Sequence, residues 1–333
     1  MHETMLENGL DFILDAANLL KSAEDTSNVE EKEKALKYSM LHLSSGIELI
    51  MKFRLYIDNW TYIFADMNKA NKRELNSGEL KTVDYENCKS RLYNLCGVEI
   101  SEKNKKYFES LRRNRNKVEH FMTDATIEAI EASINNALTA TLVFLQENYD
   151  DMSFPAKGFE FRKLTGKERN LISEIVNVVS SLQRHHEEAI KLAIEQTKEV
   201  CLESDLVECP SCREKVMVIN YDNHNNCHCY MCGYSANGEE AAKEYLSNIE
   251  GIDEYITIKD GGEFPLYKCP DCGNTSLLER KNQYVCFYCR MIYPVKEISF
   301  CSECGVPYWI EDLKIEEDLG LCPSCLEYKM KKD

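Results

Sequence analysis

The chain has 333 residues and a formal net charge of −17 at pH 7, with 57 Asp and Glu against 40 Lys and Arg. This acidity excludes a protein whose whole surface attracts phosphates, so any contact with nucleic acid must be local. No apolar run approaches the roughly 18 residues of a membrane span, and the acidic start of the chain lacks the apolar region of a secretory signal. We therefore expect a cytoplasmic protein with no membrane partner, in which paired cysteines bind metal rather than form disulfides.

Residues 4–150 are predicted to be helical, and we place an all-α bundle over residues 1–152. In the segment 30–58 the apolar residues recur at alternating spacings of four and three, which is typical of a helix packed in a bundle. A second amphipathic helix is predicted to start at Asp124, a candidate N-cap. The inward positions of these two helices are Leu36, Met40, Leu43, Ile47, Ile50, Arg54 and Ile57, and Ile127, Ile130, Ile134, Leu138, Leu142 and Leu145.

Shorter helices are predicted over 60–70, 84–95 and 101–121, with a turn at 76–78 and a stop at Gly97. The last of these segments reverses the sign of the chain, because it holds seven Lys and Arg against three Asp and Glu. Composition alone favours a solvated run of charge. On an ideal helix, however, Arg115 falls about 40° from the centre of an apolar stripe, where a guanidinium is costly unless it is paired or faces another subunit. The stripe consists of Tyr107, Leu111, Val118 and Met122, and the opposite face carries Arg113, Asn116, Lys117 and His120.

The run Arg115-Asn116-Lys117-Val118-Glu119-His120 resembles the Arg-x4-His signature of HEPN domains. The length of the bundle and the late position of the motif helix are also similar to that family. Glu48, in the segment 46–52, looks like the polar residue that an early helix of the family offers to the site. The resemblance covers residues 4–150.

The resemblance implies a metal-independent endoribonuclease, often a toxin or an antiphage-defence effector, that acts as a homodimer on an RNA substrate. A ribose 2′-hydroxyl would attack the adjacent phosphate, with His120 as general base or acid. Arg115 would hold the phosphate and neutralise its growing charge. Asn116 and Glu48 would orient neighbouring groups, and Arg112, Arg113 and Lys117 would bind the nucleic acid.

Arg115 and His120 lie about 140° apart on a straight helix and about 7.5 Å apart along its axis. They reach one phosphate only if the helix loosens or if two chains contribute, so the hypothesis requires a dimer. The alternative is a non-catalytic adaptor of the same architecture that binds protein or RNA, because many family members bind without cutting.

A linker helix is predicted over residues 160–204. Residues 153–158 break the helical pattern and mark a domain edge, and residues 165–168 have the form of a capping box. The sequence leaves open whether this helix is a spacer rod or pairs two subunits. Its apolar positions are Leu171, Ile172, Ile175, Val178, Val179 and Leu182.

Six Cys-x-x-Cys pairs follow residue 208. Taken two at a time in chain order, the pairs are separated by 16, 13 and 17 residues, which is the length of a hairpin. Two such pairs complete a tetrahedral site of four sulfurs that suits Zn²⁺. We predict three zinc ribbons, over 205–250 with a short helix at 239–249, over 262–296 and over 297–333, each with one structural zinc ion. The predicted ligands are Cys209, Cys212, Cys229 and Cys232, then Cys269, Cys272, Cys286 and Cys289, then Cys301, Cys304, Cys322 and Cys325.

Two alternatives for the ligands stay open. Cys286 and Cys289 could share an ion with Cys301 and Cys304. Cys227, His228 and the nearby His224 offer alternative ligands in the first site, where Cys227 could replace Cys229. A shell of four sulfurs leaves no position for water, so the ribbons are expected to be structural.

The ribbons also differ as recognition surfaces. The middle ribbon is rich in aromatic and basic residues, which suits stacking of unpaired bases, although packing of its small core accounts for most of these aromatics. The last ribbon is acidic and is better suited to docking a protein partner.

Overall fold

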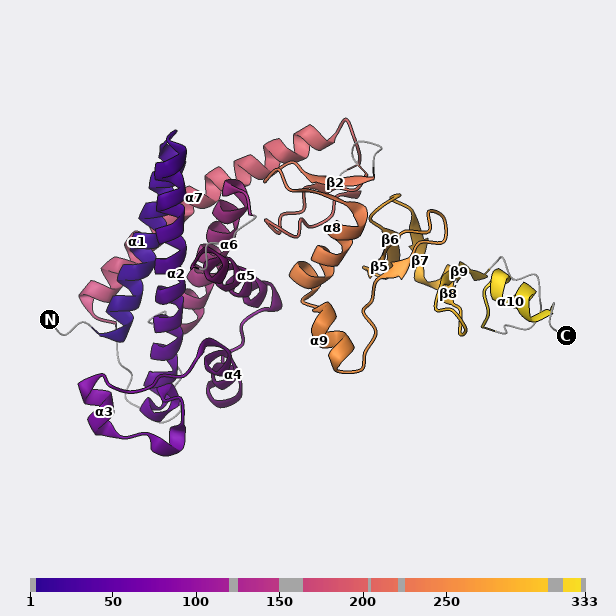
Figure 1. The fold of residues 1–333 in the computed structure, drawn as a ribbon. Coiled ribbons are helices and arrows are strands. Elements are labelled where there is room, and N and C mark those ends of the chain that lie inside the picture. The colour runs from indigo at the N-terminus through magenta and orange to yellow at the C-terminus, as the bar shows by residue number, and fades with distance from the viewer. Residues whose placement is uncertain are drawn as a thin grey trace. The chain divides into compact units, whose positions relative to one another are not determined.

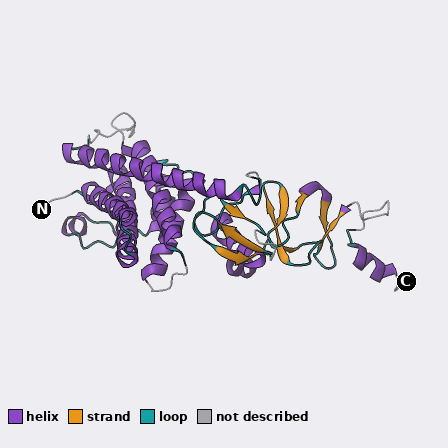
Figure 2. Cartoon of the chain, turned by 90° about the horizontal axis from the view of Figure 1, so that it is seen from above, coloured by secondary structure: helices purple, strands orange, loops and turns teal. Residues whose placement is uncertain are grey.

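The computed structural model describes residues 4–119, 125–149, 164–202, 205–220, 225–310 and 320–330. A helical region over residues 5–197 precedes small antiparallel sheets that carry three four-cysteine clusters. The chain divides into two compact units, Met1–Glu188 and Ala189–Asp333, and the division falls within one long helix. The described strands, drawn in orange in Figure 2, all belong to the second unit.

The first unit is built on a hairpin of two long helices, α1 (Met5–Asp25) and α2 (Val29–Asp58), as Figure 1 shows. The helices approach closely at Gly46, where a Cβ would lie 2.6 Å from Cγ1 of Ile13. The predicted seam of α2 is confirmed, because its apolar residues from Leu36 to Ile50 are buried. Arg54, which shares that seam, pairs with Asp58 at 2.7 Å.

The bundle continues with shorter helices and then two longer ones. They are the 3-10 turns Trp60–Ile63 and Met67–Lys69, then α3 (Lys72–Ser77), α4 (Tyr85–Cys96), α5 (Glu102–Glu119) and α6 (Ile127–Tyr149). The helix predicted over 60–70 is therefore two single turns. Gly97 ends α4 in the left-handed conformation, as predicted. The N-cap of α6 is Thr126, whose Oγ1 accepts from the Ala129 amide at 3.2 Å, and Asp124 lies outside the described residues.

The helix predicted as a linker is α7 (Gly166–Thr197). Its capping box is present, because Oε2 of Glu168 accepts from the Thr165 amide at 2.7 Å and Oγ1 of Thr165 accepts from the Glu168 amide at 3.1 Å. The first part of α7 packs into the core of the bundle, a role that the sequence did not suggest. The side chains that it contributes to this core are Leu171, Ile175, Val179 and Leu182.

The second unit holds three small sheets, each antiparallel and each in sequence order. The first is β1 (Met217–Val218), β2 (Asn226–Cys229) and β3 (Ser235–Asn237). The second is β4 (Tyr267–Lys268), β5 (Thr275–Arg280), β6 (Gln283–Cys286) and β7 (Ile292–Pro294), followed by a 3-10 turn, Val295–Glu297. The third is β8 (Ile298–Phe300) and β9 (Pro307–Trp309), before α10 (Pro323–Met330).

The predicted helix at 239–249 is α8 (Gly238–Tyr245), which continues into a π-helical turn, Leu246–Glu250. A further short helix, α9 (Glu254–Lys259), was not predicted. Helix α8 joins the first two ribbons, because a Cβ on Gly238 would lie 2.3 Å from the carbonyl oxygen of Phe287. The ring of Tyr245 lies 5.3 Å from that of Phe287.

The second and third ribbons are joined by aromatic side chains. The ring of Phe300 lies 4.5 Å from that of Tyr267, and the ring of Trp309 lies 5.0 Å from that of Tyr293. In the middle ribbon Tyr284, Phe287 and Tyr293 are buried. These aromatics therefore serve as core, and base stacking on them is not supported.

Candidate functional site

The twelve predicted cysteine ligands form three groups of four, which we call the first, second and third cysteine cluster in chain order. Within each cluster the four sulfurs lie within 4.8 Å of one another, and each cluster could hold a zinc ion. The pairing of consecutive knuckles is confirmed, so Cys286 and Cys289 do not share a site with Cys301 and Cys304. Cys227 is not in a cluster, because its Sγ donates to the carbonyl of Phe287 at 3.4 Å. His224 lies outside the described residues.

The spacing of the sulfurs fits a tetrahedral zinc ion. Zinc–sulfur bonds of about 2.3 Å place the sulfurs of a tetrahedron about 3.8 Å apart, whereas a disulfide needs about 2.05 Å. Sulfur pairs across the hairpins lie at 3.8 and 3.6 Å in the first cluster, 3.6 and 3.7 Å in the second and 3.7 Å in the third. The donor set and its spacing therefore agree.

A repeated turn presents these sulfurs. In five knuckles the residue after the second cysteine has a positive φ, and its amide donates to the carbonyl of the first cysteine at 2.8 to 2.9 Å; these residues are Arg213, Gly233, Gly273, Arg290 and Gly305. In the sixth knuckle the chain continues into α10 instead. The glycines are visible in the sequence as a sign of this turn. The two arginines give no such sign.

The three clusters differ in exposure. All four cysteines of the first cluster are buried, the second has two buried and two half-buried cysteines, and Cys304 of the third is exposed. In the second cluster hydroxyl groups lie against the sulfurs, with Tyr293 Oη 3.0 Å from Cys269 Sγ and Ser276 Oγ 3.2 Å from Cys286 Sγ. The third cluster is thus the most open to solvent.

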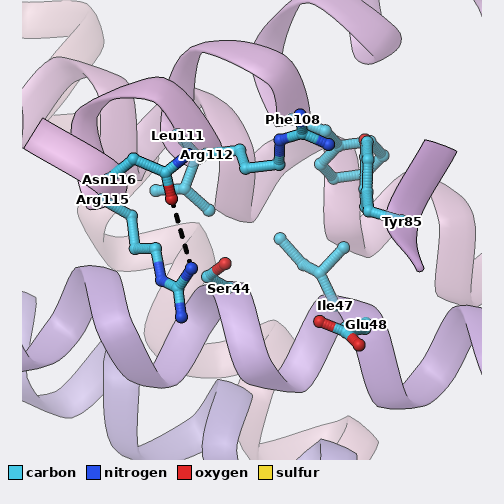
Figure 3. Close-up of a pocket in the computed structure, with 9 residues that line it drawn as sticks. All are labelled: Ser44, Ile47, Glu48, Tyr85, Phe108, Leu111, Arg112, Arg115 and Asn116. Carbon is cyan, nitrogen blue, oxygen red and sulfur yellow. Dashed lines mark hydrogen bonds between the residues drawn. The ribbon is translucent and has the colours of Figure 1, made fainter. Parts of the chain in front are cut away.

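A separate pocket of about 240 Å³ lies in the helical bundle, between α2, α4 and α5. Figure 3 shows Arg115 reaching from α5 toward Ser44 on α2, with the Glu48 carboxylate one turn further along α2. Three of the four predicted catalytic residues, Glu48, Arg115 and Asn116, therefore line one pocket. The full lining is Ser44, Ile47, Glu48, Tyr85, Phe108, Leu111, Arg112, Arg115 and Asn116.

Hydrogen bonds and ion pairs position the polar groups of this pocket. Arg115 Nη1 donates to Asn116 Oδ1 at 3.2 Å. Glu48 pairs with Lys52, a buried lysine that also donates to Thr82 Oγ1 at 2.8 Å. Because an ammonium as buried as that of Lys52 needs a counter-charge, this contact holds the Glu48 carboxylate in the lining of the pocket.

The three predicted nucleic-acid contacts differ in their surroundings. Arg112 Nη1 bonds Glu86 Oε1 at 2.8 Å, and its guanidinium lies 5.1 Å from the centre of the Tyr85 ring. Lys117 is exposed. Arg113 is half-buried, and burial lowers the pKa of its guanidinium. Only Lys117 of the three is thus largely open to solvent.

The predicted general base, His120, lies outside the described residues, immediately after α5. Sequence reasoning missed Lys52 and Tyr85. Lys52 could have been found as the i+4 partner of Glu48 on a predicted helix. Tyr85 gave no signal. Burial, followed by the nearby Glu109 and Glu86 carboxylates, raises the pKa of its phenol, so it stays protonated at neutral pH.

No family model, curated protein or solved structure matches this chain. Within the described part of the chain, no helix combines the length and apolarity that crossing a membrane requires.

Proposed function

We propose that this protein is a metal-independent endoribonuclease whose active site is built around the bundle pocket. The supporting observation is that α2 contributes Glu48 to the same pocket that receives Arg115 and Asn116 from α5. The sequence named these residues through their resemblance to the HEPN motif. Glu48 is distant in the chain from Arg115 and Asn116. If the motif matched by chance, there would be no reason for Glu48 to line the same pocket as these two residues.

In this proposal the Arg115 guanidinium binds the scissile phosphate and neutralises the charge that develops on it. His120 moves the proton: it accepts it from the ribose 2′-hydroxyl, or donates it to the leaving 5′-oxygen. The new bond joins the 2′-oxygen to phosphorus and the bond to the 5′-oxygen breaks, which leaves a 2′,3′-cyclic phosphate. DNA lacks the attacking hydroxyl and is not cut.

The site is proposed to form between two copies of the chain. Positions five residues apart on a helix are separated by about 140° and about 7.5 Å, so one straight helix does not bring Arg115 and His120 to the same phosphate. A homodimer supplies Arg115 from one subunit and His120 from its partner. A toxin or a defence effector is the biological setting that we propose for such an activity.

The test is cleavage of single-stranded RNA by the full chain. We expect Arg115→Ala and His120→Ala each to lower the rate by about 10²- to 10⁴-fold. Arg73→Ala, which removes an exposed guanidinium from α3 of the same bundle, should retain the wild-type rate. On expression, the wild type and Arg73→Ala should be toxic and the other two variants harmless at equal abundance. If all four proteins behave alike in both assays, the nuclease proposal is wrong.

A second candidate is a non-catalytic adaptor, and one observation favours it. Helix α9 exposes three apolar side chains, Tyr255, Ile256 and Ile258, at 73%, 56% and 59% of their full surface. Such a cluster on an ordered helix is typical of a surface that binds protein. The docking site predicted on the acidic third ribbon stays a proposal, because residues 311–319 lie outside the described part. RNA left intact by a correctly folded, dimeric protein would favour this candidate.

A further inference from the structure

The third cysteine cluster differs from the other two in how its sulfurs are protected. Cys304 is the one exposed member of the twelve clustered cysteines, all of which lie in the described part of the chain. In the first cluster all four cysteines are buried, and in the second the hydroxyls of Tyr293 and Ser276 cover sulfurs that are themselves buried. A reagent in solution therefore meets the Cys304 sulfur first.

Among the described residues the third cluster also has a smaller packed core around it than the second. Among the described residues that core consists of Cys301, Tyr308, Leu321 and Cys322, with Cys325 and Leu326 packed against it, so half of its members are the ligands themselves. Little apolar packing is left to hold the four sulfurs together if one of them changes chemically. Binding of zinc supplies much of the folding free energy of such small modules.

A second sulfur lies ready to react with an oxidised Cys304. The sulfurs of Cys304 and Cys322 are 3.7 Å apart, and a disulfide forms at about 2.05 Å. The two sulfurs must therefore approach by somewhat less than about 2 Å. They belong to two hairpin knuckles whose small core offers little resistance to such a movement.

We propose that Cys304 is a modification site for peroxides, and that its oxidation empties the third cysteine cluster. The Cys304 thiolate attacks one peroxide oxygen, the O–O bond breaks, and Cys304 becomes a sulfenic acid as hydroxide leaves. The Cys322 thiolate then attacks the Cys304 sulfur, a disulfide forms and a second hydroxide leaves. The two sulfurs supply the two electrons that reduce the peroxide. The remaining pair of thiolates, Cys301 and Cys325, no longer completes a four-sulfur shell.

The experiment adds hydrogen peroxide in small steps to the zinc-loaded full chain. Released zinc is read with a chromogenic chelator, and each cysteine is read by differential alkylation and peptide mass spectrometry. We expect one of the three zinc ions to leave first, together with protection of Cys304 and Cys322 from alkylation as a linked pair. The cysteines of the first two clusters should remain reduced at that stage.

The same peroxide titration is applied to Cys304→Ser, which should be less sensitive to peroxide than the wild type. If this variant binds zinc poorly, the labelling of the cysteines in the wild-type chain still tests the proposal. A matched control is Cys96→Ser, which removes a half-buried cysteine that belongs to no cluster and should leave the release of the first ion unchanged. Three ions that leave together would overturn the proposal, as would a first disulfide in another cluster or equal peroxide sensitivity of Cys304→Ser and the wild type. None of these outcomes depends on ribonuclease activity.

Discussion

Gly238, the first residue of α8, gives the sharpest test of how the ribbons are joined. A Cβ at this position would lie 2.3 Å from the Phe287 carbonyl oxygen and 2.5 Å from the Tyr288 Cα. Both are backbone atoms, so no rotamer change relieves the clash, and α8 must move by about 1 Å from the second ribbon to reach van der Waals contact. That movement loosens the packing of Tyr245 on Phe287.

Gly238→Ala should therefore destabilise the joint between the first two ribbons. Overpacking of this kind costs about 1–3 kcal/mol, and a new alanine in a helix returns at most about 1 kcal/mol. We expect a net loss of about 1–2 kcal/mol, which corresponds to about 5- to 30-fold faster hydrogen exchange at the amides of the joint. The Phe287 amide, which donates to Ser276 O at 2.9 Å, is the one to follow.

Gly166→Ala is the matched control, because Gly166 is the first residue of α7 and has open space around its Cβ position. This variant should be neutral or slightly more stable. If the two alanine variants show the same exchange as the wild type, α8 does not pack on the second ribbon as the structure places it.

Three further outcomes are expected. Removal of zinc with a strong chelator should abolish exchange protection over residues 205–330 and leave that of the helices in 5–182 unchanged, because the three cysteine clusters found among the described residues all lie in the second unit. Equal loss in both units would contradict this. Lys52→Met should lower the free energy of unfolding of the bundle by about 1 kcal/mol, because it removes the partner of the half-exposed Glu48 carboxylate. An unchanged midpoint of thermal unfolding would show that this ion pair contributes nothing. Burial raises the pKa of the Cys88 and Cys96 thiols to about 12, assisted at Cys96 by Asp58. Their thiolates, and with them the alkylation of these two cysteines in the native chain, should appear only as the pH nears that value. Fast alkylation of Cys88 and Cys96 at neutral pH would show that these thiols are accessible and ionised.

The helices and the metal ligands could be predicted from the sequence, because each depends on the spacing of residues within a short segment. The seam from Leu36 to Ile50 repeats at helical period, and the zinc knuckles carry both their ligands within four residues. The same holds for the capping box at Thr165 and the stop at Gly97. In each case the chemistry of one short segment decides its structure.

The joints between elements could not be predicted, because they depend on residues far apart in the chain. Nothing in the sequence around Gly238 indicates that it faces Phe287, and nothing in α7 shows that Leu171 and Ile175 belong to the bundle core. The pocket is an intermediate case. A family resemblance brought Glu48 and Arg115 to attention, and helical spacing could have added Lys52, whereas Tyr85 is brought into the lining by packing alone.

The chemistry of the RNA ends tests the central proposal most directly. The full chain is incubated with single-stranded RNA in excess chelator of divalent ions, at a chelator strength that leaves the three cysteine clusters loaded, and the products are identified by mass spectrometry. We expect 2′,3′-cyclic phosphate and 5′-hydroxyl ends, which should be lost in Arg115→Ala and absent when the ribose at the cleaved linkage is 2′-deoxy. Products with 5′-phosphate ends, or intact RNA with a dimeric and folded protein, would contradict it.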